Sequence, residues 1–448
     1  MVKHVCNSSK LTNFTAYFQI MLANIPESEH KRVVIVGAGF GGLKLARHLS
    51  NKPFQVVLID KNNFHSFQPL FYQVATAGIE PSAISFPLRK IFQGYKNIHV
   101  RMAHVKKVFP DTREIETSIG NLTYDYLVLA QGAGNNFFGN ASISTFSLPM
   151  KSVGESLGLR NTILNNFEKA LNTTDPEVQA RLMNMVVVGG GPTGVEISGA
   201  LAEMKNFVLP KDYPELDFSR MHIYLVENGN RLLGGMSEKS SHKAEKYLEK
   251  LGVTVMLNSY VNDFDNDTVW IGKDKKLSTR TLIWAAGIKA NLIEGLNESQ
   301  FARGNRIMVD QFNRVKGCEN IFVIGDAAFM TEQKYPNGHP QVAQVAIQQA
   351  RTLARNLKSL ENNQPLKEFE YRDLGTLATV GRNRAVVDLG FFRFQGLIAW
   401  FFWMFIHLMA IVGVKNRLII FINWAYYYFT YDQSLRLIIK PKMREGIL

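Results

Sequence analysis

Cysteine is scarce in this chain, whose 448 residues contain only Cys6 and Cys318. The two lie far apart and show no metal-type spacing, so neither a disulfide framework nor a cysteine-based zinc site is expected. A calcium-binding loop rich in aspartate is also missing, and we expect no bound metal. These absences favour a reducing environment that faces the cytoplasm.

The first 30 residues lack an uninterrupted apolar run of seven or more, which argues against a secretory signal peptide. We interpret residues 1–30 as an N-terminal extension, with Met21 as an alternative start. Ordered structure is expected from Lys31 onward.

The composition excludes disorder and collagen, because 46% of the residues are hydrophobic and 20% are charged. The length allows two or three globular domains. A formal charge of +13 suits nucleic acid, an anionic membrane or a polyanionic cofactor. No nucleic-acid-binding motif is present, so nucleic acid is not expected as a partner.

Short apolar runs occur along the chain at residues 33–36, 56–59, 126–129, 185–188, 223–226, 282–284 and 321–324. Runs of this length, bounded by Gly and Asp, are typical of strands that are buried on both faces of a parallel sheet. The start of a β-α-β unit occurs at residue 33 and again at residue 186. The sequence therefore predicts an α/β fold with two Rossmann-like dinucleotide-binding domains, one inserted in the other.

The first glycine-rich motif, Gly-Ala-Gly-Phe-Gly-Gly at positions 37–42, follows the first run directly. Its glycines permit a tight turn and a close approach of the backbone to a pyrophosphate at a helix N-terminus. Asp60 ends the next strand, 18 residues after Gly42, where a carboxylate accepts hydrogen bonds from ribose hydroxyls.

The second motif, Gly-Gly-Gly-Pro-Thr-Gly at positions 189–194, has Glu227 at the end of its second strand. A carboxylate there favours a free 2′-hydroxyl over a 2′-phosphate, and hence NADH over NADPH; the alternative is that Glu227 merely caps the strand. We interpret segment 207–221, which contains two prolines, as a surface insertion.

Two nucleotide sites in one chain indicate a flavin and a nicotinamide. Gly325 and Asp326, which follow another strand, strengthen this because the Asp can hold ribityl or pyrophosphate oxygens. The predicted domains are an FAD-binding domain over 31–150 and 290–380, an NADH-binding domain over 151–289, and a C-terminal membrane-anchoring region over 381–448.

The order of these elements resembles that of the two-dinucleotide-domain flavoproteins related to glutathione reductase. Two stretches narrow the resemblance to the type II NADH:quinone oxidoreductases, single-subunit respiratory enzymes that do not pump protons. These are Phe-Gln-Pro-Leu-Phe-Tyr-Gln-Val-Ala-Thr-Ala-Gly at 67–78 and Ala-Gln-Val-Ala-Ile-Gln at 343–348, which matches the family's AQxAxQ motif. The similarity runs from about residue 31 to about residue 435.

The resemblance implies non-covalent FAD, NADH as substrate, and a membrane quinone, ubiquinone or menaquinone, as acceptor. It places Glu196 near the contact of nicotinamide and flavin, whereas a plain carboxylate at a helix start would look the same. Gln344 and Gln348 lie four apart, so they share one helix face and could donate to the quinone carbonyls or to flavin and nicotinamide groups; an exposed polar face is the alternative. The expected catalytic residues are Glu196, Gln344 and Gln348.

The expected binding residues are, for FAD, Gly37, Gly39, Phe40, Gly41, Gly42, Asp60, Lys61, Gln68, Thr76, Ala130, Gly132, Gly325, Asp326, Ala343 and Gln344; for NADH, Gly189, Gly191, Pro192, Thr193, Gly194, Glu196, Glu227, Ala286 and Gly287; and for quinone, Gln344, Ile347 and Gln348. Gly78 would line the quinone slot beside Thr76. Residues 70–77 contain no cysteine, so the thiol chemistry of disulfide reductases and sulfide:quinone oxidoreductases is not expected.

The C-terminal part is aromatic and basic. Residues 391–431 include 15 aromatic side chains, and residues 380–448 hold nine Lys/Arg against three Asp/Glu. Segment 396–414 has 19 uncharged residues, although its aromatic and basic flanks suit the membrane interface better than a span. We expect interfacial helices on an anionic leaflet, peripheral on the cytoplasmic side of the inner membrane; a transmembrane hairpin and a homodimer interface are alternatives.

Segment 375–384 resembles the family's strand before the anchor. Some relatives place a lysine in its turn, where this chain has Asn383 between Arg382 and Arg384. The arginines could bind lipid phosphate or form a solvated turn. Two rival functions remain open: a flavin reductase for a soluble electron carrier such as rubredoxin or ferredoxin, and a non-enzymatic flavoprotein that senses NADH.

Overall fold

The computed structural model describes residues 23–432 and 435–439. Most of the predicted N-terminal extension, including Cys6 and Met21, lies outside the described residues, as do residues 440–448 of the C-terminal region.

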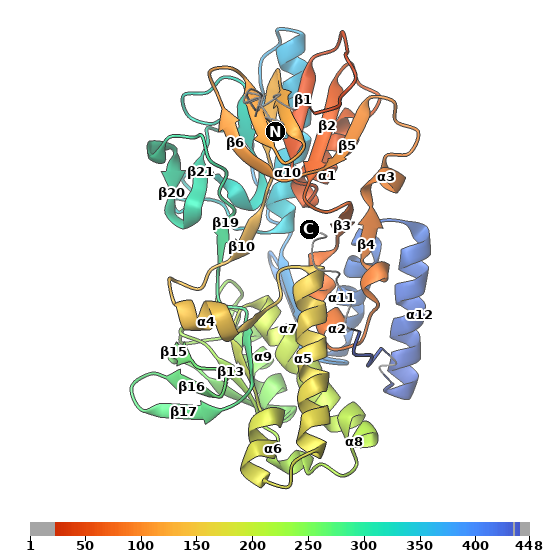
Figure 1. Cartoon of the computed structure of the whole chain (residues 1–448), viewed down its shortest axis with the longest axis vertical. Helices are drawn as coiled ribbons and strands as arrows, with labels where there is room; N and C mark the ends of the chain where they lie inside the picture. The colour runs from red at the N-terminus through yellow and green to blue at the C-terminus, as the bar shows by residue number, and fades with distance from the viewer. Residues whose placement is uncertain (1–22, 433–434, 440–448) are drawn as a thin grey trace, which may run out of the picture.

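The first sheet is parallel, in the order β22-β9-β1-β2-β5. Its strands are β1 (Arg32–Val36), β2 (Gln55–Asp60), β5 (Ile98–Met102), β9 (Tyr126–Leu129) and β22 (Ile321–Val323). Helices α1 (Phe40–Leu49) and α10 (Ala343–Glu361) cover one face, and the small sheet of β6 (Val105–Phe109), β7 (Glu114–Thr117) and β8 (Gly120–Thr123) lies over the other (Figure 1). Val33 and Val34 enter different core clusters, which explains the unbroken apolar runs.

The second sheet is also parallel, in the order β11-β18-β12-β13-β14. It comprises β11 (Leu148–Pro149), β12 (Met185–Val188), β13 (Ile223–Val226), β14 (Val253–Met256) and β18 (Thr281–Trp284). The longer helices of this unit are α5 (Val153–Leu171), α6 (Pro176–Met183), α7 (Pro192–Glu203) and α9 (Glu238–Lys250). An antiparallel sheet of β15 (Val261–Phe264), β16 (Thr268–Ile271) and β17 (Lys275–Ser278) also belongs to it. The whole unit lies in sequence between β9 and β22, so the predicted α/β fold with one unit inserted in the other is confirmed.

The two chain crossings between the units are paired with each other. Strand β10 (Ala133–Asn135) carries the chain out and β19 (Ile288–Ala290) carries it back, and they form a two-stranded antiparallel ribbon (Figure 1). Three residue pairs join them, from Ala133–Ala290 to Asn135–Ile288.

The C-terminal region begins with an antiparallel sheet of β24 (Thr376–Thr379), β25 (Ala385–Leu389) and β26 (Phe392–Gln395), and continues with α11 (Leu397–Ala410) and α12 (Val414–Thr430). Val380, Trp403 and Trp424 belong to the same core cluster as residues of α7, so this region packs on the inserted unit. Within residues 23–432 and 435–439, no helix combines the length and the hydrophobicity that a membrane crossing requires.

Smaller elements connect these parts: β3 (Phe64–Ser66), η1 (Gln68–Leu70), α2 (Phe71–Ala75), η2 (Pro81–Ala83), β4 (Ser85–Pro87), α3 (Leu88–Ile91), α4 (Ala141–Phe146), η3 (Met204–Val208), α8 (Leu209–Asp212), η4 (Phe218–Arg220), η5 (Glu298–Gln300), β20 (Phe301–Ala302), η6 (Arg303–Asn305), β21 (Arg306–Met308), η7 (Gly325–Ala327) and β23 (Ala328–Phe329). The interpretation of segment 207–221 as a surface insertion is wrong in part, because Leu209 and Met221 are fully buried. Its apolar side chains fill the core beside α7.

Candidate functional site

The first glycine motif forms a sharp turn between β1 and α1. Gly37 has a φ of +102°, and a Cβ there would lie 2.3 Å from the carbonyl oxygen of Ala130. A Cβ at Gly42 would lie 1.8 Å from the carbonyl oxygen of Gly37. Only glycine fits at these two positions. In the second motif, Gly189 and Gly194 repeat both approaches.

Asp60, at the end of β2, and Glu227, directly after β13, accept hydrogen bonds from the glycine turns. Asp60 accepts a hydrogen bond from the backbone N–H of Ala38 at 2.7 Å, and burial raises the pKa of this carboxyl. Glu227 accepts from the N–H of Gly190 at 2.5 Å and from the N–H of Gly229 at 2.6 Å. Each carboxylate therefore stabilises its glycine turn. It also lies where the sequence predicts a contact with a ribose hydroxyl.

Both helices that follow the motifs have free N-termini. No side chain caps α1 at Gly39 or α7 at Gly191, and a Cβ at either glycine would meet nothing within 4 Å. By contrast, Ser152 and Ser237 cap α5 and α9 with their hydroxyl groups. Open space in front of uncapped N–H groups fits the pyrophosphate of a dinucleotide. The residues present therefore fit two dinucleotides.

Asp326 lies at the third predicted turn, after β22. Burial raises the pKa of its carboxyl, and Lys151 and Arg306 oppose that rise; the Lys151 Nζ atom is 4.0 Å away. The backbone N–H of Gly325 donates to Gln349 Oε1 at 2.7 Å. The sequence reasoning did not identify Lys151, Arg306 or Gln349, because only the fold brings them to this turn.

Gln344 and Gln348 hold the backbone of segment 372–375. Gln344 Nε2 donates to the carbonyl oxygen of Gly375 at 3.0 Å, and its Oε1 accepts from the N–H of Leu374 at 3.1 Å. Gln348 makes a similar pair with Arg372, at 2.8 and 3.1 Å. Both amides are thus engaged with the backbone that leads into β24.

A pocket that is partly open to solvent lies where α2, α7, the β24–β25 turn, α11 and α12 meet. It is lined by Tyr72, Gln73, Thr76, Gly78, Glu196, Ala200, Glu203, Thr379, Gly381, Arg382, Trp400, Trp403, Met404, Trp424, Tyr427 and Tyr428. Of the predicted site residues, Thr76, Gly78 and Glu196 line it, whereas Gln344, Ile347 and Gln348 do not.

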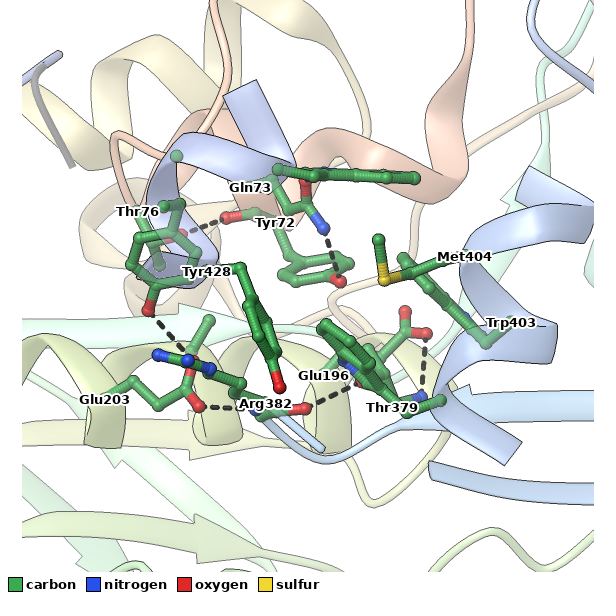
Figure 2. A pocket seen from close by; sticks show the side chains of 16 residues that line it. Tyr72, Gln73, Thr76, Glu196, Glu203, Thr379, Arg382, Trp403, Met404 and Tyr428 are labelled. Atoms are coloured by element: carbon green, nitrogen blue, oxygen red, sulfur yellow. Dashed lines mark hydrogen bonds between the residues drawn. The ribbon is translucent and has the colours of Figure 1, made fainter. Parts of the chain in front are cut away.

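Figure 2 shows Glu196 and Glu203 on one side of the cavity and Tyr72 and Gln73 on the other. Gln73 Nε2 donates to the Tyr72 hydroxyl at 2.9 Å, and its Oε1 accepts from the indole N–H of Trp424 at 2.8 Å. This chain of hydrogen bonds ties α12 to α2.

Burial raises the pKa of Glu196 to about 8, with smaller opposing contributions from the Thr379 amide and the Trp403 indole. Burial also raises the pKa of Glu203, which accepts hydrogen bonds from the Arg382 backbone N–H and, at 3.1 Å, from the Tyr427 hydroxyl. Sequence reasoning missed Glu203, although it follows Glu196 by two helical turns on the same face of α7.

The side chain of Arg382 is partly buried, so the alternative of a solvated turn is wrong for this residue. Its guanidinium carbon lies 4.0 Å from the ring centre of Tyr428 and 3.9 Å from that of Tyr431, and two of its nitrogens are buried. Cation–π contacts of this kind hold the end of α12 against the β24–β25 turn. Asn383 has a φ of +61°, a left-handed conformation that Asn tolerates.

The other predicted residues lie at the turns described above. Phe40 contacts the rings of His65 and Phe67. Lys61 and Gln68 are exposed, and Ala130 is buried. Gly132 and Gly287 have φ values of +66° and +101°; Ala286 precedes the latter. Gly41 begins α1 beside Phe40, Pro192 and Thr193 begin α7, and Ala343 begins α10.

Comparisons with known proteins cover nearly the whole chain. Residues 31–350 match the pyridine nucleotide-disulphide oxidoreductase family, and residues 374–430 match the NDH2 C-terminal domain. The type II NADH:quinone oxidoreductase Ndh of Mycobacterium tuberculosis is 34% identical over 419 residues, which are 89% of this chain and 88% of that protein. NdhA of the same organism, also a type II NADH:quinone oxidoreductase, is 35% identical over 411 residues, 88% of this chain and 86% of that protein.

Among solved structures, NDH2 from Plasmodium falciparum in complex with NADH has a TM-score of 0.83 at 23% identity. The match covers 92% of this chain and 100% of that one. The sulfide:quinone oxidoreductase of Aquifex aeolicus has a TM-score of 0.69 at 19% identity, covering 86% and 92%. Both likenesses show the fold.

Proposed function

Because this chain belongs to the family of type II NADH:quinone oxidoreductases, we propose that it oxidises NADH and reduces a quinone by way of non-covalently bound FAD. FAD held at the glycine turn of residues 37–42 would supply the hydride acceptor for NADH and the two-electron donor for the quinone, without proton pumping. In this proposal residues 31–150 and 290–380 bind FAD, residues 151–289 bind NADH, and residues 381–448 attach the protein to the membrane.

The observation that carries this proposal is the cavity between α7 and the anchor helices. Its walls are largely apolar and aromatic, with Trp400, Trp403 and Trp424 among them, which suits a flat ring better than a charged substrate. Elements of the two nucleotide units and of the C-terminal region all contribute to it.

In this proposal Glu196 holds a proton beside the quinone; Glu203, on the same cavity wall, also has a raised pKa. Quinone reduction consumes two protons, and a carboxyl with a pKa of about 8 holds a proton near neutral pH. Thr76 donates its hydroxyl to the Tyr72 carbonyl at 3.0 Å, so it shapes the wall of the slot in this proposal.

We keep Gln344, Ile347 and Gln348 as residues that support quinone reduction, although they do not line the cavity. The two amides act by holding segment 372–375, which enters β24 and reaches Thr379 and the cavity. We expect Gln344→Ala and Gln348→Ala to slow quinone turnover, because the strand that carries Thr379 loses its support. Steady-state turnover with a water-soluble quinone, at unchanged flavin content, measures this; unchanged turnover would contradict the role.

Membrane attachment is supported by the exposed apolar side chains of α11 and α12. Ile398, Phe401, Phe405, Leu418 and Phe429 are each more than half exposed, a density that marks an interaction surface. We propose that these helices lie in the interface of an anionic membrane, peripherally, on the cytoplasmic side of the inner membrane. A homodimer through the same face is the competing use of this surface.

The test uses the purified protein in detergent and follows the flavin absorbance. NADH should bleach it, and a water-soluble quinone should restore it rapidly. Bleaching without recovery would move the acceptor to a soluble carrier, and a single reduction without turnover would favour an NADH sensor. A purified protein that contains no flavin would contradict the proposal.

A further inference from the structure

Helices α1 and α10 present a strongly basic face away from the first sheet. We call it the α1/α10 face and define it by Lys44, Arg47, His48, Arg351, Arg355 and Lys358. The spacings of three and four residues place these side chains on one side of each helix. The two helices pack together over the same sheet, so the two basic rows form one surface.

The cations of this face have no acidic partners among residues 23–432 and 435–439. Neither helix contains Asp or Glu before Glu361, and Glu361 is paired with Lys31 at 3.2 Å. In the described part of the chain, no carboxylate lies within ion-pair distance of Lys44, Arg351 or the other members. Elsewhere in the described residues some cations do pair, such as Arg280 with Asp267.

The basic groups also act on one another. Burial lowers the pKa of Lys44, and Arg351 and Arg47 lower it further. Burial together with Lys44, Arg351, Lys358 and Arg355 lowers the pKa of His48, whose Nε2 is buried and has no hydrogen-bond partner. A surface that holds like charges this close is stabilised by an external anion.

The core beneath the α1/α10 face also contacts the segment that joins α11 and α12, the helices that carry the exposed apolar side chains. Val412, between α11 and α12, packs against the core cluster that lies beneath α1 and α10, and so does Ile91 of α3. Arg89 and Lys90 of α3 are exposed, and α3 and α12 follow one another along one side of the molecule (Figure 1). Lys415 and Arg417, at the start of α12, bring basic groups to the junction.

We propose that the α1/α10 face binds the anionic headgroups of the bilayer on which α11 and α12 dock. This inference rests on the proposed membrane attachment and adds a second contact, from the FAD-binding unit, that is remote in sequence from the C-terminal region. Apolar insertion by α12 and headgroup binding by α1 and α10 together fix the orientation of the molecule on the membrane. Apolar insertion and electrostatic attraction to headgroups add to one another at an anionic interface.

The test is vesicle co-sedimentation of the full protein carrying Arg47→Gln, Arg351→Gln and Arg355→Gln together. All three side chains are exposed, so the fold should be kept. The matched control changes Lys273, Lys275 and Lys276 to Gln, which removes the same charge from the exposed β16–β17 hairpin. The vesicles are phosphatidylcholine alone and phosphatidylcholine with phosphatidylglycerol.

We expect the arginine variant to lose roughly 100-fold of its partitioning to the phosphatidylglycerol vesicles, about fivefold per charge, and to bind pure phosphatidylcholine as the unmodified protein does. The control should keep its binding, and added salt should abolish the difference between control and variant.

Equal loss in control and variant would overturn the proposal, because net charge alone would then explain the binding. Unchanged vesicle binding, accompanied by loss of affinity for a single-stranded DNA oligomer, would overturn it in favour of a nucleic-acid surface. NADH oxidation with a water-soluble quinone is measured in parallel and should be the same in variant and unmodified protein. If the unmodified protein did not catalyse this reaction, the proposed function would be contradicted. A change in vesicle binding alone would not contradict it.

Discussion

Replacing Glu196 with Gln should change how the stability of the protein depends on pH. Glu196 is buried in the cavity, and its pKa rises from 4.5 to about 8 on folding. Between these values the native state keeps a proton that the unfolded chain has released. Stability therefore falls as the pH rises through this window, and Glu196→Gln, which cannot ionise, removes the fall.

The size of the effect follows from the shift. Each pH unit inside the window costs about 1.4 kcal/mol, so from about pH 5.5 to about pH 7.5 the Glu196→Gln protein should gain about 3 kcal/mol relative to the unmodified one. Well above pH 8 the difference should level off near 5 kcal/mol. Other groups titrate in both proteins and cancel in the difference.

Denaturant unfolding followed by tryptophan fluorescence measures this difference, since Trp400, Trp403 and Trp424 line the cavity. Ser198→Ala, a buried change on the same helix, is the control and should shift stability equally at every pH. Infrared spectra at neutral pH should show a protonated carboxyl band that Glu196→Gln lacks. A Glu196→Gln difference that does not vary with pH would refute the assignment of the proton.

Three further outcomes are expected. Arg382→Lys should weaken the stacking on the two tyrosines by about 1–2 kcal/mol and speed hydrogen exchange in α12 by roughly tenfold; unchanged exchange would mean that the stacking does not hold the helix. Gly37→Ala should yield protein without flavin absorbance, because the added Cβ would lie 2.3 Å from the carbonyl oxygen of Ala130; normal flavin content would contradict this. Glu227→Gln should raise the KM for NADH by roughly tenfold and make the enzyme less selective for NADH over NADPH at full flavin content. An unchanged ratio of the two KM values would mean that Glu227 only stabilises the glycine turn.

The parallel sheets could be predicted well from the sequence because their strands are buried on both faces. Three of them, Tyr126–Leu129, Met185–Val188 and Ile223–Val226, have the predicted bounds. Helix α1 begins at Phe40, inside the glycine motif at 37–42, so the last glycines of the motif already belong to the first turn of the helix.

The cavity could be predicted only in part. Thr76 and Glu196 belong to recognisable motifs and do line it, but Tyr72, Arg382 and Tyr428 come from three distant segments. Nothing in the spacing of Tyr428 and Tyr431, at and just beyond the end of α12, indicates that they enclose an arginine of the β24–β25 turn. Gln344 and Gln348 share a helix face as expected, but their backbone partners at 372–375 could not be read from sequence.

The ribbon of β10 and β19 limits how the two nucleotide units can move. Two separate linkers would let the inserted unit twist and swing in any direction, whereas two hydrogen-bonded strands act as one strip. The three residue pairs prevent the two crossings from sliding past one another unless these hydrogen bonds break. A displacement of one crossing therefore carries the other with it, so the inserted unit keeps one register relative to the first unit.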